Sequence, residues 1–98
     1  MKNKSRKETK MKVQNITSNN GNKIANQFIV NDDNGNTYFQ SYNSMIVKLN
    51  GDRVELDKKY WNYSNTTGKY RNIFLNETIK DTRAKIKSGE YILTDLNK

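Results

Sequence analysis

The sequence of 98 residues contains no cysteine and no histidine. The first absence excludes a disulfide framework and a thiolate nucleophile, and the two together remove the usual ligands of a zinc site. No stretch approaches the roughly 20 apolar residues of a membrane-spanning helix. No apolar segment follows the charged N-terminus, as one does in a secretory signal. These absences predict a cytoplasmic protein that holds no metal or cofactor and contacts no membrane.

The sequence also lacks a recognisable catalytic constellation. Without histidine or cysteine, catalysis would depend on carboxylates, lysines or a hydroxyl nucleophile with a lysine base. Asp32 and Asp33 are adjacent in a predicted turn, so they point apart. Their string NDDNGN resembles half of a calcium-binding loop, but with Gly35 at the sixth position, Val30 and Ser41 fall where that loop needs carboxylates. The sequence predicts a protein that is not an enzyme and has no catalytic residue.

Hydrophobic residues make up only 33% of the chain, and the formal net charge is +8. Residues 1–12 hold six cations and one acid, residues 13–56 three cations and four acids, and residues 57–90 eight cations and four acids. This distribution favours a polyanionic partner, although lysines also serve simply to keep small domains soluble. Residues 1–12 lack any periodicity and are predicted to be a flexible basic arm, ahead of a single α+β domain over residues 13–98.

Alternating apolar residues and Asn-Gly pairs dominate the first half of the domain. Asn-Gly between alternating segments is the strongest short signal for a β-hairpin, and it occurs at Gly21, Gly35 and Gly51. The pattern predicts an antiparallel β-meander of four to five short strands, drawn from residues 13–18, 24–30, 37–42, 45–49 and 54–56.

Helical signals begin after residue 57. Ser64 or Asn65 is suited to cap a helix over residues 66–77. From Thr78 the chain is expected to restart the helix as the second of a pair, or to continue it, and to stop at Ser88-Gly89. The last strand is expected over residues 91–94, and the helix pair should cover one face of the sheet.

The segment YWNYSNTTGKYRNIFL, residues 60–75, is the densest aromatic and basic stretch of the chain. A helix start offers free N–H groups to an anion, and tyrosines beside cations resemble the stacking platforms of single-strand binding proteins. The candidate residues for binding nucleic acid or another partner are Lys58, Lys59, Tyr60, Tyr63, Ser64, Thr66, Thr67, Lys69 and Arg71. The alternative is an ordinary helix cap beside a hydrophobic core.

Aromatic side chains are also needed to fill a thin core. A buried ring covers about 150–250 Å², and Tyr70 and Phe74 lie four residues apart, with Ile73 expected on the same helix face. We therefore assign Trp61, Tyr70 and Phe74 to the core. The positions of Tyr60 and Tyr63 stay open, because residues that enter a helix can point either way.

The strings YFQSYNSMIVKL, YWNYSNTTGKYRNIFL and IKSGEYILTDLN resemble a group of small proteins of unassigned activity from phages and plasmids of low-GC Gram-positive bacteria. The resemblance covers residues 27–97 and implies a mobile-element origin and a bacterial host cytoplasm. It implies an accessory factor for DNA metabolism or an inhibitor of host defence, such as an anti-CRISPR protein.

Three functional hypotheses follow from these observations. The first is a non-enzymatic accessory protein that binds the phosphate backbone of nucleic acid through the basic, aromatic helix start. The second is an inhibitor that binds a host nucleoprotein defence complex by protein–protein contact. The third is a structural or regulatory phage protein that acts as a homodimer.

Overall fold

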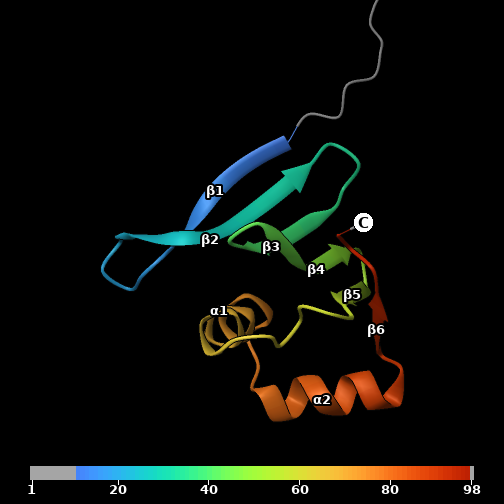
Figure 1. Cartoon of the computed structure of the whole chain (residues 1–98). Coiled ribbons are helices and arrows are strands. Elements are labelled where there is room, and N and C mark those ends of the chain that lie inside the picture. The colour runs from blue at the N-terminus through green and yellow to red at the C-terminus, as the bar shows by residue number, and fades with distance from the viewer. Residues whose placement is uncertain (1–10, 98) are drawn as a thin grey trace, which may run out of the picture.

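A single sheet backed by two helices forms the protein (Figure 1). The computed structural model describes residues 11–97. Its elements are β1 (Met11–Thr17), β2 (Lys23–Asp32), β3 (Thr37–Ser41), β4 (Ser44–Asn50), β5 (Arg53–Asp57), α1 (Asn65–Leu75), α2 (Ile79–Ser88) and β6 (Tyr91–Thr94). The predicted basic arm lies outside the described residues except for Met11 and Lys12, which begin β1.

The six strands stand in the order of the sequence, β1 to β6. Each neighbouring pair from β1 to β5 is antiparallel, whereas β6 pairs with β5 in parallel. The predicted α+β class is confirmed. The sheet holds more strands than the predicted meander, and it is mixed, because the closing strand reaches β5 only after the chain has crossed the sheet face through both helices. Among residues 11–97, no helix is both long and apolar enough to span a bilayer.

Tight turns connect the first five strands. Each glycine of the three Asn-Gly pairs has a positive φ, as the predicted hairpin turns require. The β3–β4 turn has no glycine, and Tyr42 adopts the left-handed conformation there with φ of 56°. Its N–H donates to the Asn26 carbonyl at 2.7 Å, so this backbone conformation is supported by a bond to β2.

A break in β2 changes which of its side chains reach the core. Strict alternation predicts Ile24 and Ile29 on opposite faces, yet both pack against the hydrophobic core. Asn26 between them has a φ of 65°, and the pairing with β1 shifts register at this place. A left-handed residue inside a strand inserts a bulge, which reverses the facing of the residues before it.

The start of α1 and the end of α2 lie at the predicted residues, whereas α1 ends at Leu75, two residues before the predicted end. The Ser64 side chain accepts a hydrogen bond from the Thr67 N–H, Thr78 forms a capping box with Asp81, and Gly89 ends α2 in the left-handed conformation. Phe74 stacks on Phe39 of β3 with ring centroids 5.7 Å apart. Both helices lie on this side of the sheet (Figure 1).

The apolar face predicted for α1 is only partly correct. Tyr70 and Phe74 pack against the core as expected, but Ile73 is 54% exposed. The face toward the sheet is centred on Thr67, Arg71 and Phe74. With about 100° between successive helical residues, Ile73 lies a third of a turn from that centre.

Gln27 is a polar side chain placed inside the core layer. It is fully buried and pairs with Ser41, whose hydroxyl shares a 3.0 Å hydrogen bond with Thr67 of α1. Neither amide atom of Gln27 has a hydrogen-bond partner among residues 11–97. A buried polar group without a partner costs about 1–3 kcal/mol.

We therefore expect Gln27→Met, which preserves length and removes the unbonded amide, to raise the free energy of unfolding by about 1–2 kcal/mol. In a domain of this size, that gain corresponds to a rise in melting temperature of about 4–8 °C per kcal/mol. Thermal and urea unfolding measure the change. Gln40→Met is the control, because the Gln40 amide donates to the Tyr42 carbonyl. A lower melting temperature for Gln27→Met would mean that its amide is bonded in solution.

Candidate nucleic-acid interface

The loop after β5 and helix α1 form a stretch without negative charge. Residues 58–76 contain four cations and no acidic residue. A carboxylate stands at each border, Asp57 before the stretch and Glu77 after it. Both are turned inward, since Asp57 is 1% exposed and the Glu77 side chain 5% exposed. Neither carboxylate forms an ion pair with a lysine of this stretch within residues 11–97, although Asp57 lines the same cavity as Lys58, Lys59 and Asp95.

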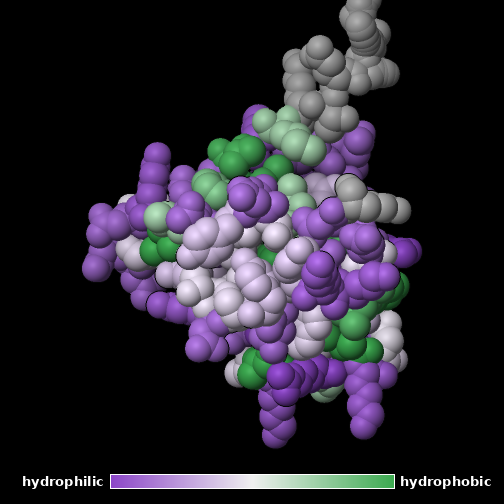
Figure 2. Space-filling model, viewed as in Figure 1, coloured by the Kyte–Doolittle hydropathy of each residue, from purple (hydrophilic) through white to green (hydrophobic). Residues whose placement is uncertain are grey.

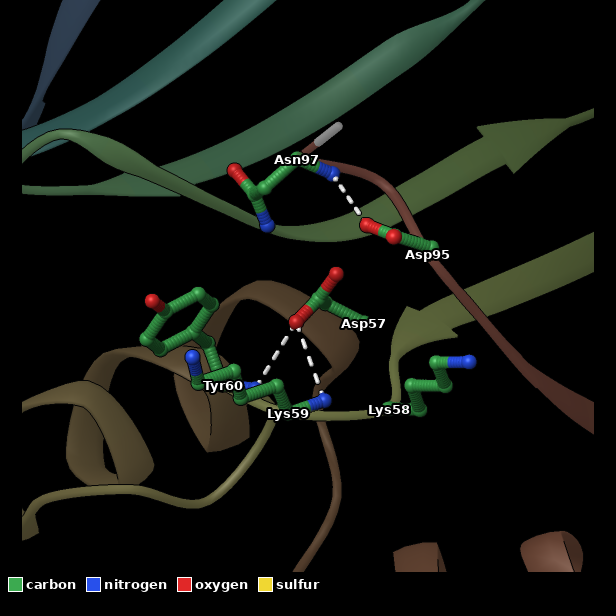
Figure 3. A pocket seen from close by; sticks show the side chains of 6 residues that line it. All are labelled: Asp57, Lys58, Lys59, Tyr60, Asp95 and Asn97. Atoms are coloured by element: carbon green, nitrogen blue, oxygen red, sulfur yellow. Dashed lines mark hydrogen bonds between the residues drawn. The ribbon is translucent and has the colours of Figure 1, made fainter.

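Asp57 holds the loop and the C-terminal segment together (Figure 3). Its carboxylate accepts hydrogen bonds from the N–H groups of Lys59 at 3.0 Å, Tyr60 at 2.8 Å and Leu96 at 2.8 Å. Burial would raise the pKa of Asp57, but these hydrogen bonds outweigh it and hold the pKa below its ordinary value. The backbone that carries the loop lysines is thus anchored where it leaves the sheet.

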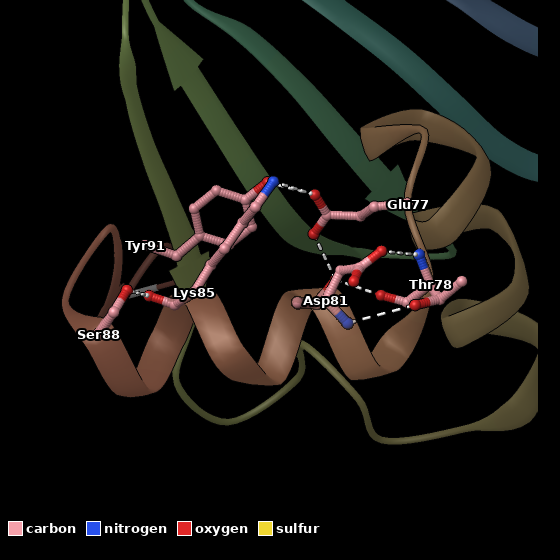
Figure 4. A network of polar contacts seen from close by, with 7 residues as sticks. Glu77, Thr78, Asp81, Lys85, Ser88 and Tyr91 are labelled. Atoms are coloured by element: carbon pink, nitrogen blue, oxygen red, sulfur yellow. Dashed lines mark hydrogen bonds and ion pairs between the residues drawn. The ribbon is translucent and has the colours of Figure 1, made fainter.

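Glu77 ties the linker between the helices to α2 and β6 (Figure 4). Its carboxylate accepts hydrogen bonds from the Thr82 hydroxyl, the Lys85 ammonium at 2.9 Å and the Tyr91 hydroxyl at 2.7 Å. Burial raises the pKa of Glu77, and the hydrogen bonds from these three groups lower it by more, so it stays below the ordinary value. The negative charge of Glu77 is therefore paired within the fold, with the Lys85 ammonium and two hydroxyl donors.

Arg71 is not available to a phosphate, contrary to its place among the predicted binding residues. It is 1% exposed. Its guanidinium donates to the Trp61 carbonyl at 2.8 Å, to Asn62 Oδ1 at 3.0 Å and to Asn72 Oδ1 at 2.9 Å. It also lies 5.2 Å from the centroid of the Trp61 ring. Burial, with the charge of Arg83, lowers the pKa of Arg71. Arg71 therefore fixes the loop from inside.

The three hydroxyl groups at the start of α1 differ in how exposed they are to solvent. Thr67 is fully buried and hydrogen-bonded to Ser41 and Ser64, so its hydroxyl is not accessible to a ligand. Ser64 is half-buried and caps the helix. Thr66 is exposed. At Ser64 and Thr67, the helix-cap interpretation describes what these hydroxyls do.

The aromatic residues also separate into core and surface. Trp61 and Tyr70 pack against the core, as predicted, and Tyr60 joins them. Tyr63 is 47% exposed and meets Tyr60 edge to face at 5.3 Å between ring centroids. Tyr63 is thus the predicted aromatic residue that presents the most surface to a ligand.

The predicted lysines are exposed but do not converge. Lys58, Lys59 and Lys69 are all exposed, and none forms an ion pair within residues 11–97. Lys59 lies against Tyr60, with its ammonium 5.3 Å from the ring centroid, whereas Lys58 points away from it (Figure 3). Lys69 is on α1, 5.3 Å from the Tyr70 ring centroid. The cations thus cover a basic surface without forming a single groove.

Asp57 and Glu77, the inward carboxylates at the two borders of this stretch, are not among the predicted site residues. The signal that identifies them is their position as the last acids on either side of a 19-residue run, 58–76, that has none. Hydrophilic side chains cover most of the face seen in Figure 2. Hydrophobic ones show around β1, where Met11 and Val13 are exposed, and around β6, where Ile92 and Leu93 are exposed.

The comparisons identify a family and nothing more specific. A family model described as a family of unknown function (DUF8033) matches residues 11–92. No curated protein and no solved structure matches the chain. The matched range runs from the first residue of β1 into β6, so it contains the whole basic surface.

Proposed function

The chain belongs to DUF8033, a family of unknown function, and we propose that it is a non-enzymatic protein that binds the phosphate backbone of nucleic acid. The contacts are made by the exposed lysines Lys58, Lys59 and Lys69, and Tyr63 and Thr66 are the exposed aromatic and hydroxyl residues that lie between them in the chain. Its origin as an accessory protein of a mobile element remains part of this proposal.

One observation supports the proposal above the others. Three exposed lysines stand on a segment that has no acid, and the two bordering carboxylates are buried and bonded within the fold. Asp57 and Arg71 anchor the loop backbone from both ends, so the lysines are presented without a large ordering cost. Phosphate contacts of this kind fix position but carry no sequence information.

Salt dependence gives the test. Each lysine that neutralises a phosphate contributes about 0.7 (single strand) to 0.9 (duplex) to the slope of log K against log salt. We expect affinity to fall steeply between about 50 and 200 mM salt, and the double variant Lys58→Gln/Lys69→Gln to lower the slope by about 1.4–1.8. Fluorescence anisotropy with labelled DNA and RNA measures both effects.

The matched control is Lys80→Gln/Lys87→Gln, which removes the same charge from exposed positions on α2. An equal loss of slope in both double variants would mean that net charge, not this surface, drives binding. A flat salt response, or no binding at micromolar protein, would end the proposal. A stoichiometric protein partner captured from nuclease-treated host lysate would instead favour inhibition of a host nucleoprotein.

A further inference from the structure

A groove of about 370 Å³ runs between the tip of the β1–β2 hairpin and α1. Residues 17–19 and Ile24 line it from the hairpin, and Lys69, Tyr70 and Ile73 line it from the helix. Figure 1 shows the hairpin tip and α1 on the same side of the molecule. The groove therefore lies beside the basic surface and shares Lys69 with it.

Both walls of the groove come from stretches that lack acidic residues. Residues 11–31 contain two cations and no acid, as residues 58–76 contain four cations and no acid. The Lys69 ammonium lies over the Tyr70 ring on the helix, and no carboxylate among residues 11–97 lines the groove. Charge complementarity therefore points to an anionic occupant.

The floor of the groove is apolar and aromatic. Ile73 is the large hydrophobic residue of α1 left exposed, at 54%, and Tyr70 and Ile24 are half-buried beside it. Hydroxyl and amide groups of Thr17, Ser18 and Asn19 stand on the hairpin side. This combination suits a flat ring with polar edges, carried on a charged chain.

Resting on the function proposed above, we infer that this groove receives an unpaired base of single-stranded nucleic acid. The base packs against Ile73 and Tyr70, and a flanking phosphate lies near Lys69. A duplex keeps its bases stacked inside and offers this groove only phosphates, so it leaves the apolar floor uncovered. An acidic peptide would supply charge for the lysines but no ring for the floor.

Strand preference separates base contact from charge. Duplex DNA has the higher charge density, so a protein that binds phosphates alone holds duplex at least as tightly as single strand. One stacked base adds about 1–3 kcal/mol, which is about 5- to 150-fold in affinity. We expect the full-length protein to bind 12-nucleotide single-stranded DNA or RNA about tenfold more tightly than a 12-base-pair duplex at equal salt.

Ile73→Asp tests the groove directly, since it places a carboxylate on the apolar floor at an exposed helix position. We expect it to weaken single-strand binding about tenfold and to shrink the difference between single strand and duplex. Ile92→Asp is the matched control, because Ile92 is exposed on β6 and the charge change is identical. Thermal unfolding confirms that both variants are folded.

The outcomes distinguish this inference from the function it rests on. Equal affinity for single strand and duplex, or equal effects of Ile73→Asp and Ile92→Asp, would overturn base binding in the groove. Phosphate binding by the lysines would be unaffected by either result. Absence of any nucleic-acid binding overturns both. A polyglutamate peptide that binds as tightly as the oligonucleotide, and is released by Ile73→Asp, reassigns the groove to an acidic peptide.

Discussion

Arg71→Ala is expected to destabilise the protein by about 3–5 kcal/mol, the range for truncating a large buried side chain. Arg71 is the largest fully buried side chain of residues 11–97. Its loss leaves a cavity and removes the donors to the Trp61 carbonyl and to the side-chain oxygens of Asn62 and Asn72. A cost of this size is a large share of the total stability of about 5–15 kcal/mol that is typical of a small domain.

Two further variants show that the guanidinium itself matters. Arg71→Lys keeps the charge but loses the planar fork that reaches three acceptors, so we expect an intermediate loss of about 1–3 kcal/mol. Arg83→Ala removes an exposed arginine of α2 and should change stability by no more than about 0.5 kcal/mol. Urea unfolding measures all three.

Trp61 gives a local readout of the same contact. It is the single tryptophan of the chain, and the Arg71 guanidinium lies against its ring. In Arg71→Ala the folded protein should fluoresce at longer wavelength, because water reaches the indole. An unchanged emission maximum together with unchanged stability would show that the loop is held without Arg71.

The burial of Arg71 is a feature of the fold that local sequence patterns do not predict. The Asn-Gly pairs, the Ser64 cap and Gly89 are local signals, and they predict three hairpin turns, the start of α1 and the end of α2 correctly. They do not predict the end of α1 at Leu75 or the Thr78 capping box. Burial of Arg71 depends on three acceptors that its fold brings together, two of them nine or ten residues away. No local sequence pattern indicates that these acceptors surround Arg71. An arginine among tyrosines is therefore interpreted from sequence as a surface cation.

The facing of residues in β2, the turn at Tyr42 and the pairing of β6 also could not be predicted from local sequence. Alternation along β2 predicts one facing for Ile24 and the opposite for Ile29, but the left-handed Asn26 reverses it. The turn at Tyr42 contains no glycine and is supported by a bond to the Asn26 carbonyl. Both positions owe their conformation to a neighbouring strand. The parallel pairing of β6 likewise depends on the path of the chain across the helices.

Glu77 is expected to contribute to the stability of the fold and to make that stability depend on pH. Glu77→Ala should cost about 3 kcal/mol at neutral pH, because it removes the acceptor of three hydrogen bonds from a nearly buried site and strands the Tyr91 hydroxyl. The Thr82 hydroxyl keeps a second acceptor, the Thr78 carbonyl at 3.2 Å. Exposure of the Lys85 side chain, at 36%, lets that ammonium regain water and limits the loss. Glu77→Gln keeps one acceptor oxygen and should lose less.

The pH profile identifies the charge of Glu77 as the cause. Because its pKa is lower in the folded protein than the ordinary 4.5, its contribution is complete above that value and is lost as pH falls through the depressed pKa. Burial and the bond to Glu77 raise the pKa of Tyr91 from 10.0 to about 12. The Tyr91 contribution is therefore complete below pH 10.0 and is lost as pH rises toward about 12.

Glu77→Gln should flatten both limbs of the profile and return the pKa of Tyr91 toward its ordinary value, since the neighbouring negative charge is gone. Urea unfolding at acid and alkaline pH measures how the free energy of unfolding changes at each end of the profile. Ultraviolet absorbance of the phenolate measures the ionisation of the tyrosines. Glu90→Gln is the control, because Glu90 is an exposed glutamate next to Tyr91 in the chain. If Glu90→Gln flattened the limbs as strongly, the effect would come from net charge, and the carboxylate at the junction of α2 and β6 would have no special role.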